Sequence, residues 1–310
     1  MLGKKIFENL YATGEHSIVI ISRRQMKELP GCRFIKEERS AGILQVTDEK
    51  FDLILDFIAY DDTAATEVVE NLDFEKYILI SSCWMVKLNH TNRIDEFIDT
   101  IDENQLAILP AVTQKYLLNK RAAENYLKKR LEPGRFHIIR LPLFWGEEDH
   151  TRRLEFYVSR LLDNSPIILV GGAQNICQIG YVNDLAAHLV RLFTSRLLIS
   201  QPVLEVLPDN GEKVIDVLRI IAQGIDSNSP FVQINVPELQ DRLPDYLDQE
   251  PLWRENSIVI SQNNIYKLLD SQSTAITEWL PALSALEASK MPKPGRLRES
   301  EKDLISEFIR

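Results

Sequence analysis

The feature that most constrains the fold is a series of short apolar runs, each of strand length, separated by segments with helical spacing. Near-continuous apolar runs of this length are typical of strands that a sheet buries on both faces. Strands that alternate with helices form parallel sheets, so the pattern predicts an α/β fold with a doubly wound parallel sheet. The expected strands cover residues 17–22, 51–60, 77–80 and 136–141.

Helices are expected between these strands. Ile6, Phe7 and Leu10 have the spacing of one helix face, and Gly14 is suited to end that helix. The remaining elements expected in this half of the chain are a short strand over residues 42–46, a helix over residues 63–72 and a helix over about residues 113–130.

The start of the chain has the order of the second half of a dinucleotide-binding βαβ unit: helix, short turn, buried strand, charged residue. Arg23 and Arg24 directly follow the strand at residues 17–22. In such a unit the residue after the second strand meets the adenosine ribose, where an acid suits a free 2′-hydroxyl and Arg suits a 2′-phosphate. If a cofactor binds, the two arginines favour NADP over NAD; the alternative is a solvated basic turn.

The first half of this unit is missing. A dinucleotide-binding fingerprint consists of a strand, a glycine-rich turn and then the helix. Here only Gly3 is present, at the place of the last fingerprint glycine. Because the first strand is central in a doubly wound sheet, we expect its absence to leave a gap within the sheet. Either the chain begins upstream of Met1, or this protein has no phosphate cradle.

Tyr116 and Lys120 lie four positions apart within a predicted helix. This spacing puts both side chains on the same helix face, one turn apart. A free phenol has a pKa of about 10, and an ammonium within roughly 5 Å lowers it. The pair is therefore a candidate general acid/base. The alternative is a chance pairing on a surface helix.

Polar residues follow two of the predicted strands. Asp62 comes after one of them, and Ser81, Ser82 and Cys83 come after the next. Ligands of open α/β sheets bind outside the carboxyl ends of the strands, so we expect a site here. The polar and acidic residues 89–105 are expected to form a loop or lid.

Several motif-like segments occur in a characteristic order: Tyr77 to Cys83, then Tyr116-x-x-x-Lys120 with Arg121 to Glu124, then Ile139 to Gly146, then Gly180 to Ala186. In this order they resemble the extended short-chain dehydrogenase/reductase family, and within it the NAD-dependent epimerase/dehydratase group. The resemblance covers most of residues 1–195. It implies a Rossmann-like doubly wound parallel sheet with a smaller C-terminal α+β substrate lobe.

The resemblance also implies roles for individual residues. Tyr116 would be the catalytic acid/base, and Lys120 would hold the nicotinamide ribose and lower the pKa of the tyrosine. The family's catalytic Ser or Thr falls best on Cys83, with Ser82 one residue away; a thiol is the poorer hydrogen-bond donor. The residues that would line an NADP or NAD site are Gly3, Arg23, Arg24, Ala59 and Lys120.

Cys83 has two other interpretations. It could be a nucleophile of low pKa if Lys120 is the nearby cation, or an inert buried thiol. The histidines show no metal-ligand spacing, so we expect no metal site. His137 lies in an apolar strand and is expected in the core, and the acids within residues 95–103 are expected to form a solvated face.

The C-terminal part is expected to cover the substrate. Arg152 and Arg153 precede an amphipathic helix, and either could bind a phosphate or carboxylate in bidentate fashion; surface arginine is the alternative. Asp184 begins a helix, where a carboxylate suits the free N–H groups. The lobe is expected to contain a strand at residues 203–206, a helix at 214–225, a strand at 231–236 and an irregular segment at 240–256.

We divide the chain into three parts. Residues 1–146 would form the dinucleotide-binding Rossmann-like domain without its first strand. Residues 147–280 would form the substrate-binding lobe, interleaved with the sheet. Residues 281–310 would form a charged tail, whose Leu304, Ile305 and Phe308 could dock on the chain or serve a partner.

Composition narrows the function classes. The 310 residues carry a net charge of −10, which argues against general nucleic-acid binding. No apolar run reaches the roughly 18 residues of a membrane span, and the N-terminus lacks the pattern of a signal peptide. Three widely spaced cysteines fit a reducing compartment, so we expect a cytoplasmic protein without a disulfide framework.

Two hypotheses for function remain. The first is an NAD(P)-dependent epimerase, dehydratase or reductase that acts on a hydroxyl or carbonyl carbon of a small molecule, such as a nucleotide sugar, with Tyr116 as acid/base. The second is a catalytically silent relative that serves as a binding or scaffold module. We favour the first because the Tyr/Lys helix is present. Whether the protein forms a homodimer stays open.

Overall fold

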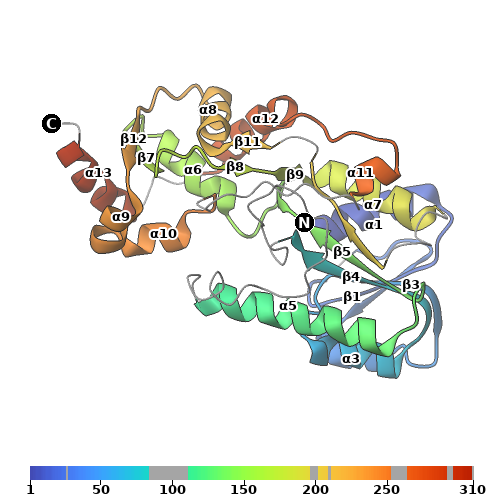
Figure 1. Cartoon of the computed structure of the whole chain (residues 1–310). Helices are drawn as coiled ribbons and strands as arrows, with labels where there is room; N and C mark the ends of the chain where they lie inside the picture. The colour runs from blue at the N-terminus through green and yellow to red at the C-terminus, as the bar shows by residue number, and fades with distance from the viewer. Residues whose placement is uncertain are drawn as a thin grey trace.

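The computed structural model describes residues 1–25, 27–83, 111–195, 202–208, 211–252, 264–291 and 296–308. Figure 1 shows a sheet with helices on both faces, and a second region of shorter strands and helices that holds the carboxyl end. The expected loop or lid at residues 89–105, including the acids within 95–103, lies outside the described residues.

A four-stranded parallel sheet forms the centre of the first region. Its order is β10-β5-β4-β3, and every neighbouring pair is parallel. Strands β4 and β5 are almost wholly buried, as their apolar sequences predict. This confirms the expected α/β fold with a parallel sheet. The strands are β3 (Lys50–Asp56), β4 (Asp73–Ser82), β5 (Phe136–Leu141) and β10 (Val203–Glu205).

A separate pair of parallel strands lies beside this sheet: β1 (Ile18–Ser22) and β2 (Cys32–Lys36). Among the described strands, no backbone pairing joins β1 or β2 to the four-stranded sheet. All five residues of β1 are only half-buried, whereas the middle of β4 is fully buried. Within the described residues the sheet is therefore divided between the β1–β2 pair and the four-stranded part.

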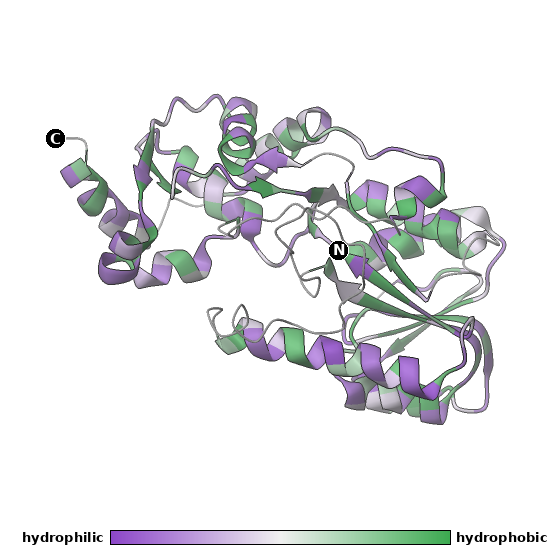
Figure 2. Cartoon of the chain, in the orientation of Figure 1, coloured by the Kyte–Doolittle hydropathy of each residue, from purple (hydrophilic) through white to green (hydrophobic). Residues whose placement is uncertain are grey.

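Helices cover both faces of the sheet. On one face, α1 (Leu2–Thr13) and α7 (Val182–Thr194) pack side by side over Ile78 and Ile80. On the other, α3 (Asp62–Asn71) and α5 (Ala111–Arg130) pack over the alternate residues of β4. Figure 2 shows the sheet strands to be largely hydrophobic and α5 to carry hydrophilic residues along its length. Among the described helices, none is both long enough and apolar enough to cross a membrane.

The prediction of a strand at residues 42–46 is wrong. The structure has a helix there, α2 (Arg39–Leu44), and the strand β2 precedes it. Gly42 explains the difference. A Cβ atom there would come within 2.3 Å of Ile21 Cγ2, so glycine lets α2 pack directly on β1. Tertiary packing thus outweighs the strand propensity of the Ile43 side chain.

The second region contains α6 (Arg153–Leu161), α8 (Val214–Gly224) and a parallel pair, β7 (Ile167–Val170) with β12 (Phe231–Ile234). Their apolar side chains share one core. Two small pairs link this region to the sheet: β6 (Leu143–Trp145) with β9 (Ile179–Tyr181), and β8 (Ile176–Cys177) with β11 (Glu212–Lys213). The remaining helices are α9 (Val236–Arg242), α10 (Pro244–Gln249), α11 (Ile265–Leu268), α12 (Ile276–Ala288) and α13 (Arg296–Phe308).

Two expectations for this region need correction. Residues 203–206 were expected in the small lobe, but β10 pairs with β5 and extends the main sheet. Residues 240–256 were expected to be irregular, but α10 and the end of α9 lie within them. Both prolines of α9 and α10 stand in the first turn, where the missing N–H does not disturb a helix.

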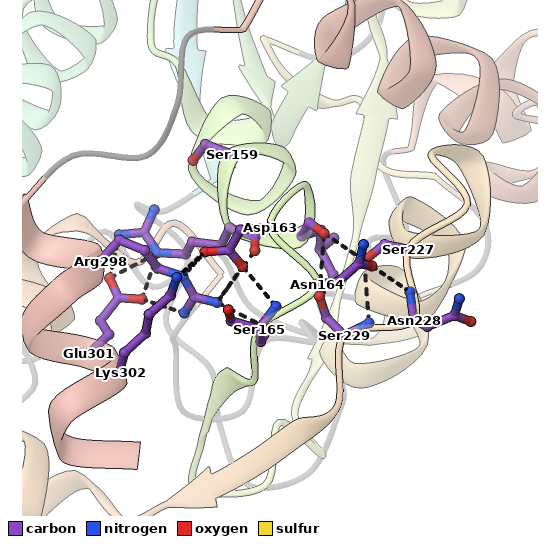
Figure 3. A network of polar contacts seen from close by, with 12 residues as sticks. Ser159, Asp163, Asn164, Ser165, Ser227, Asn228, Ser229, Arg298, Glu301 and Lys302 are labelled. Carbon is purple, nitrogen blue, oxygen red and sulfur yellow. Dashed lines mark hydrogen bonds and ion pairs between the residues drawn. The ribbon is translucent and has the colours of Figure 1, made fainter. Parts of the chain in front are cut away.

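Helix α13 docks on the second region instead of extending away from it. Leu304 and Ile305 are buried in its core. Arg160 binds Glu301 with an Nη2–Oε1 distance of 2.7 Å, and Arg298 binds both Asp163 and Glu301 at 3.1 Å. Figure 3 shows this cluster of charges where α13 meets the end of α6.

This docking predicts a difference between two glutamates of α13. Glu301→Ala removes a fully buried carboxylate and leaves two arginines short of a partner, so we expect a loss of roughly 3–5 kcal/mol in the free energy of unfolding. Glu307→Ala removes an exposed partner of Arg242 and should cost about 0–1 kcal/mol. Urea unfolding of both variants checks this. Equal losses would show that the buried cluster does not hold α13.

Candidate active site

The candidate site lies where the carboxyl ends of β3 and β4 meet the amino-terminal half of α5. The structure brings four expected residues together here: Ala59, Ser82, Tyr116 and Lys120. Ala59 follows β3, Ser82 ends β4, and the other two lie on α5. The predicted helix spacing thus directs Tyr116 and Lys120 toward the carboxyl edge of the sheet.

Lys120 bonds the backbone of two neighbouring strands. Its Nζ donates to the carbonyl oxygens of Ala59 at 3.0 Å and Ile80 at 2.9 Å, and it lies 4.8 Å from the centre of the Tyr60 ring. The side chain is only 2% exposed. Burial lowers the pKa of Lys120 to about 8, although the carboxylates of Asp56 and Glu124 act in the opposite direction.

Tyr116 is half-buried and hydrogen-bonds the side chain of Ser82. Burial raises the pKa of the Tyr116 phenol above its ordinary value, and the bond to Ser82 and the charge of Arg153 offset only part of this effect. The expectation that Lys120 leaves Tyr116 with a lowered pKa is therefore wrong for this structure. The physical reason is that the ammonium is directed at two backbone carbonyls, while the phenol is removed from water.

Cys83 is 5% exposed, and its Sγ donates to the carbonyl oxygen of Arg140 at 3.3 Å. Burial raises the pKa of the Cys83 thiol well above its ordinary value. The interpretation of Cys83 as a low-pKa nucleophile beside Lys120 is therefore wrong. Ser82, and not Cys83, is the residue in contact with Tyr116.

The two expected substrate arginines differ in their surroundings. Arg152 is exposed and pairs with Glu155 on the same helix turn, so its guanidinium is already engaged at the surface. Arg153 is half-buried, and its charge acts on the Tyr116 phenol. Of the two, Arg153 is the one that the fold brings to the site.

Other residues that the sequence singled out have structural roles. His137 is buried in β5, as expected of a core residue. Asp61 caps α3 by accepting from the N–H of Ala64, and Asp62 lies in the first turn of that helix. The carboxylate of Asp184 accepts two bonds from Thr274, which ties α7 to the segment before α12.

The residues expected to hold a dinucleotide do not form a phosphate cradle. Gly3 lies in the first turn of α1, where an added Cβ would make only ordinary contact with Phe57. Lys4, in the same turn, pairs with the carboxylate of Glu148 at 2.7 Å. The one expected glycine is therefore helical, and the lysine beside it is already paired.

The two arginines expected at the ribose differ in their contacts. Arg23 is exposed, and Arg24 donates from Nη1 to Nε2 of His150 at 3.0 Å. An arginine can only donate, so His150 accepts here as the neutral imidazole. This contact joins the end of β1 to the segment after β6.

Three residues of the site were missed by sequence reasoning: Tyr60, Asp56 and Arg39. Asp56 accepts from Arg39 at 2.9 Å, from the backbone N–H of Ile58 and Ala59, and from Tyr77 Oη at 2.7 Å. These bonds shape the turn that presents the Ala59 carbonyl and the Tyr60 ring. A lone aspartate at the end of an apolar run was the available signal for Asp56; Arg39 gave none.

Among the described residues, no group of three or more His, Cys, Asp or Glu side chains could hold a metal ion. The charged groups around Lys120 are instead paired with one another and with the backbone. The chemistry that the site can support is proton transfer and hydrogen bonding at an oxygen atom.

The fold is that of the NAD-dependent epimerase and dehydratase structures, which confirms the resemblance at the level of the fold. No protein-family model matches the sequence, and no curated protein matches it. The likeness is therefore one of structure, and sequence identity to these proteins is low.

Three solved structures illustrate it. A UDP-N-acetylglucosamine 4-epimerase from Methanobrevibacter ruminantium, in complex with UDP-N-acetylmuramic acid, has a TM-score of 0.66 and 15% identity over 94% of this chain and 96% of that one. A Thermus thermophilus UDP-glucose 4-epimerase in complex with NAD has a TM-score of 0.64 and 14% identity, over 94% of this chain and 97% of that one. A Bacillus anthracis dTDP-glucose 4,6-dehydratase in complex with NAD has a TM-score of 0.66 and 12% identity, over 94% of each chain.

The environment of Lys120 predicts its titration. Its amine should lose a proton near pH 8, because burial disfavours the ammonium. The pKa of about 8 lies below the 10.5 of a free lysine, so between these values the folded chain binds fewer protons than the unfolded chain. The contribution of Lys120 to the free energy of unfolding therefore rises with pH across this window.

Heteronuclear NMR of the lysine Cε groups measures this directly. One resonance should titrate near pH 8 in the wild-type protein and be absent in Lys120→Gln. Lys115→Gln removes an exposed lysine from the same helix and should leave that resonance in place. Retention of the resonance in Lys120→Gln would contradict the assignment.

Proposed function

We propose that this protein is an epimerase-, dehydratase- or reductase-like enzyme that acts on a hydroxyl or carbonyl carbon of a sugar nucleotide, with Tyr116 as acid/base. The observation that carries the proposal is the hydrogen bond between Ser82 and Tyr116 above a buried Lys120. The substrate class is taken from proteins of the same fold, whose structures include complexes with UDP-N-acetylmuramic acid and UDP-glucuronic acid.

The protonation state of the Tyr116 phenol defines its first role. Because its pKa is raised, the phenol is protonated near neutral pH and donates to a substrate oxygen that becomes negatively charged. Ser82 hydrogen-bonds the phenol and can hold the same oxygen. Arg153 adds a positive charge on the side of the second region, where it favours a negatively charged substrate.

Proton removal is the reverse step, and it needs a phenolate. The charge of Arg153 favours that form, because a nearby cation stabilises a phenolate. The Lys120 ammonium, one helix turn from Tyr116, is held on the carbonyls of Ala59 and Ile80. Two enzymes of this fold have been solved in complex with NAD. A bound dinucleotide would supply hydride transfer, and we derive only the acid–base part for this chain.

Tyr116→Phe tests this function. We expect turnover of a responsive UDP- or dTDP-sugar to fall by about 10²–10⁴-fold, because the proton donor is lost while the ring remains. Turnover is followed by NMR of the sugar anomeric protons with NAD or NADP present. Tyr126→Phe is the matched control, since its hydroxyl lies on the same helix and has no hydrogen-bond partner among the described residues. Equal activity of Tyr116→Phe and wild type would contradict the role.

A second candidate function is favoured by the divided sheet. Among the described strands β1 and β2 do not pair with the four-stranded sheet, and the same fold can serve as a catalytically silent binding or scaffold module. Calorimetric titration with NADPH and with NADH separates the two candidates. Saturable binding of either supports the enzyme; absence of binding together with no turnover of any sugar nucleotide supports the module.

A further inference from the structure

Helix α5 presents a third side chain in line with Tyr116 and Lys120. Glu124 stands four residues after Lys120, so the three residues form one row on the helix face toward the sheet. Each of them contacts a different point of the sheet: Ser82, the Ala59 and Ile80 carbonyls, and the pair Ser81 and Arg140.

Glu124 makes the most rigid of these contacts. Its carboxylate accepts from Ser81 Oγ at 2.6 Å and from Arg140 at 3.1 Å through Nε and 2.6 Å through Nη2. Only 1% of its surface is exposed. A bidentate arginine–carboxylate pair fixes both distance and orientation. The contact therefore sets how α5 lies along β4 and across to β5.

This anchor is coupled to the site through the chain itself. Ser81, which binds Glu124, directly precedes Ser82, which binds Tyr116. An α-helix, with a rise of about 1.5 Å per residue, moves as a rigid rod. The Glu124 end of the row therefore cannot slide along β4 without moving the Tyr116 end. A displacement of roughly 1 Å is enough to lose much of the rate of an acid–base step.

Stability alone does not account for such a pair. A buried ion pair is often no more stabilising than apolar residues of the same volume, and its best-attested use is to fix a register. Arg140 also has a second buried carboxylate nearby, with Nη1 3.8 Å from Oε1 of Glu205. Its charge is thus compensated even without Glu124, which leaves geometry as the distinctive contribution of Glu124.

We propose that Glu124 is a positioning residue: by binding Ser81 and Arg140, it fixes α5 on the sheet so that Tyr116 meets Ser82 and Lys120 meets the carbonyls of Ala59 and Ile80. The effect on turnover rests on the proposed function. The effect on the position of Lys120 does not.

Glu124→Asp is the test, because it keeps the charge and shortens the side chain by one methylene, so that Ser81 and Arg140 can no longer both be reached. We expect kcat to fall about 10- to 100-fold with KM nearly unchanged. We also expect the midpoint of the Lys120 titration to move by about half a pH unit or more, because its carbonyl contacts change. The charged groups that act on Lys120 are Asp56 of β3, Glu124 of α5 and Arg39 of α2. The variant leaves Asp56 and Arg39 in place and keeps a carboxylate at position 124.

Glu205→Gln is the matched control. It neutralises a buried carboxylate that faces Arg140 from β10, which lies on the other side of β5 from β4. We expect its kcat and its Lys120 titration to stay near the wild-type values, whatever its stability. If Glu124→Asp does not fold, Glu124→Gln keeps the side-chain length and Arg140 retains Glu205; the same kcat loss is expected because one of the two arginine bonds becomes a donor–donor contact.

The titration is read without any substrate, so a protein that turns nothing over still tests the proposal. A Lys120 midpoint that is the same in wild type, Glu124→Asp and Glu205→Gln would overturn it. A shifted midpoint in Glu124→Asp alone would support it, and absence of turnover in wild type would then count against the proposed function only.

Discussion

The ammonium of Lys120 is the interaction on which the site depends, because it joins α5 to the backbone of β4 and of the turn after β3. The Ile80 carbonyl is held by the sheet, and the Ala59 turn is held by the Asp56 carboxylate. A buried amine stays charged at neutral pH only when such acceptors and nearby carboxylates compensate for the loss of water. Asp56 and Glu124 are therefore as much part of the site as the two residues of the Tyr/Lys motif.

Much of this architecture could be predicted from the sequence, because it depends on residues that are close together in the chain. The β4 and β5 runs are apolar without interruption, and the Tyr116–Lys120 spacing needs only a helix to put both residues on one face. The failures came from tertiary contacts. Gly42 packs against Ile21, so a segment with strand propensity became a helix. The Tyr116 pKa moved in the opposite direction from the one expected, because burial of the phenol depends on elements far apart in the sequence.

The divided sheet separates the edge of β3 and β4, where Tyr116 lies, from the β1–β2 pair. At the edge of β3 and β4 a phenol, a hydroxyl, a buried ammonium and an arginine converge. Among the described strands β1 and β2 pair only with each other, and Lys4 is engaged by Glu148. The hydrogen bonds of Lys120 therefore do not run through the β1–β2 pair.

The docking of α13 has a consequence for biosynthesis. Arg160 and its buried partner Glu301 are 141 residues apart in the chain. At a ribosomal rate of about 5–20 residues per second, roughly 7–28 seconds pass between the synthesis of the two. During that interval the nascent second region exposes the surface that Leu304 and Ile305 later cover. Release from a chaperone that recognises apolar surface should therefore follow the emergence of α13 from the exit tunnel.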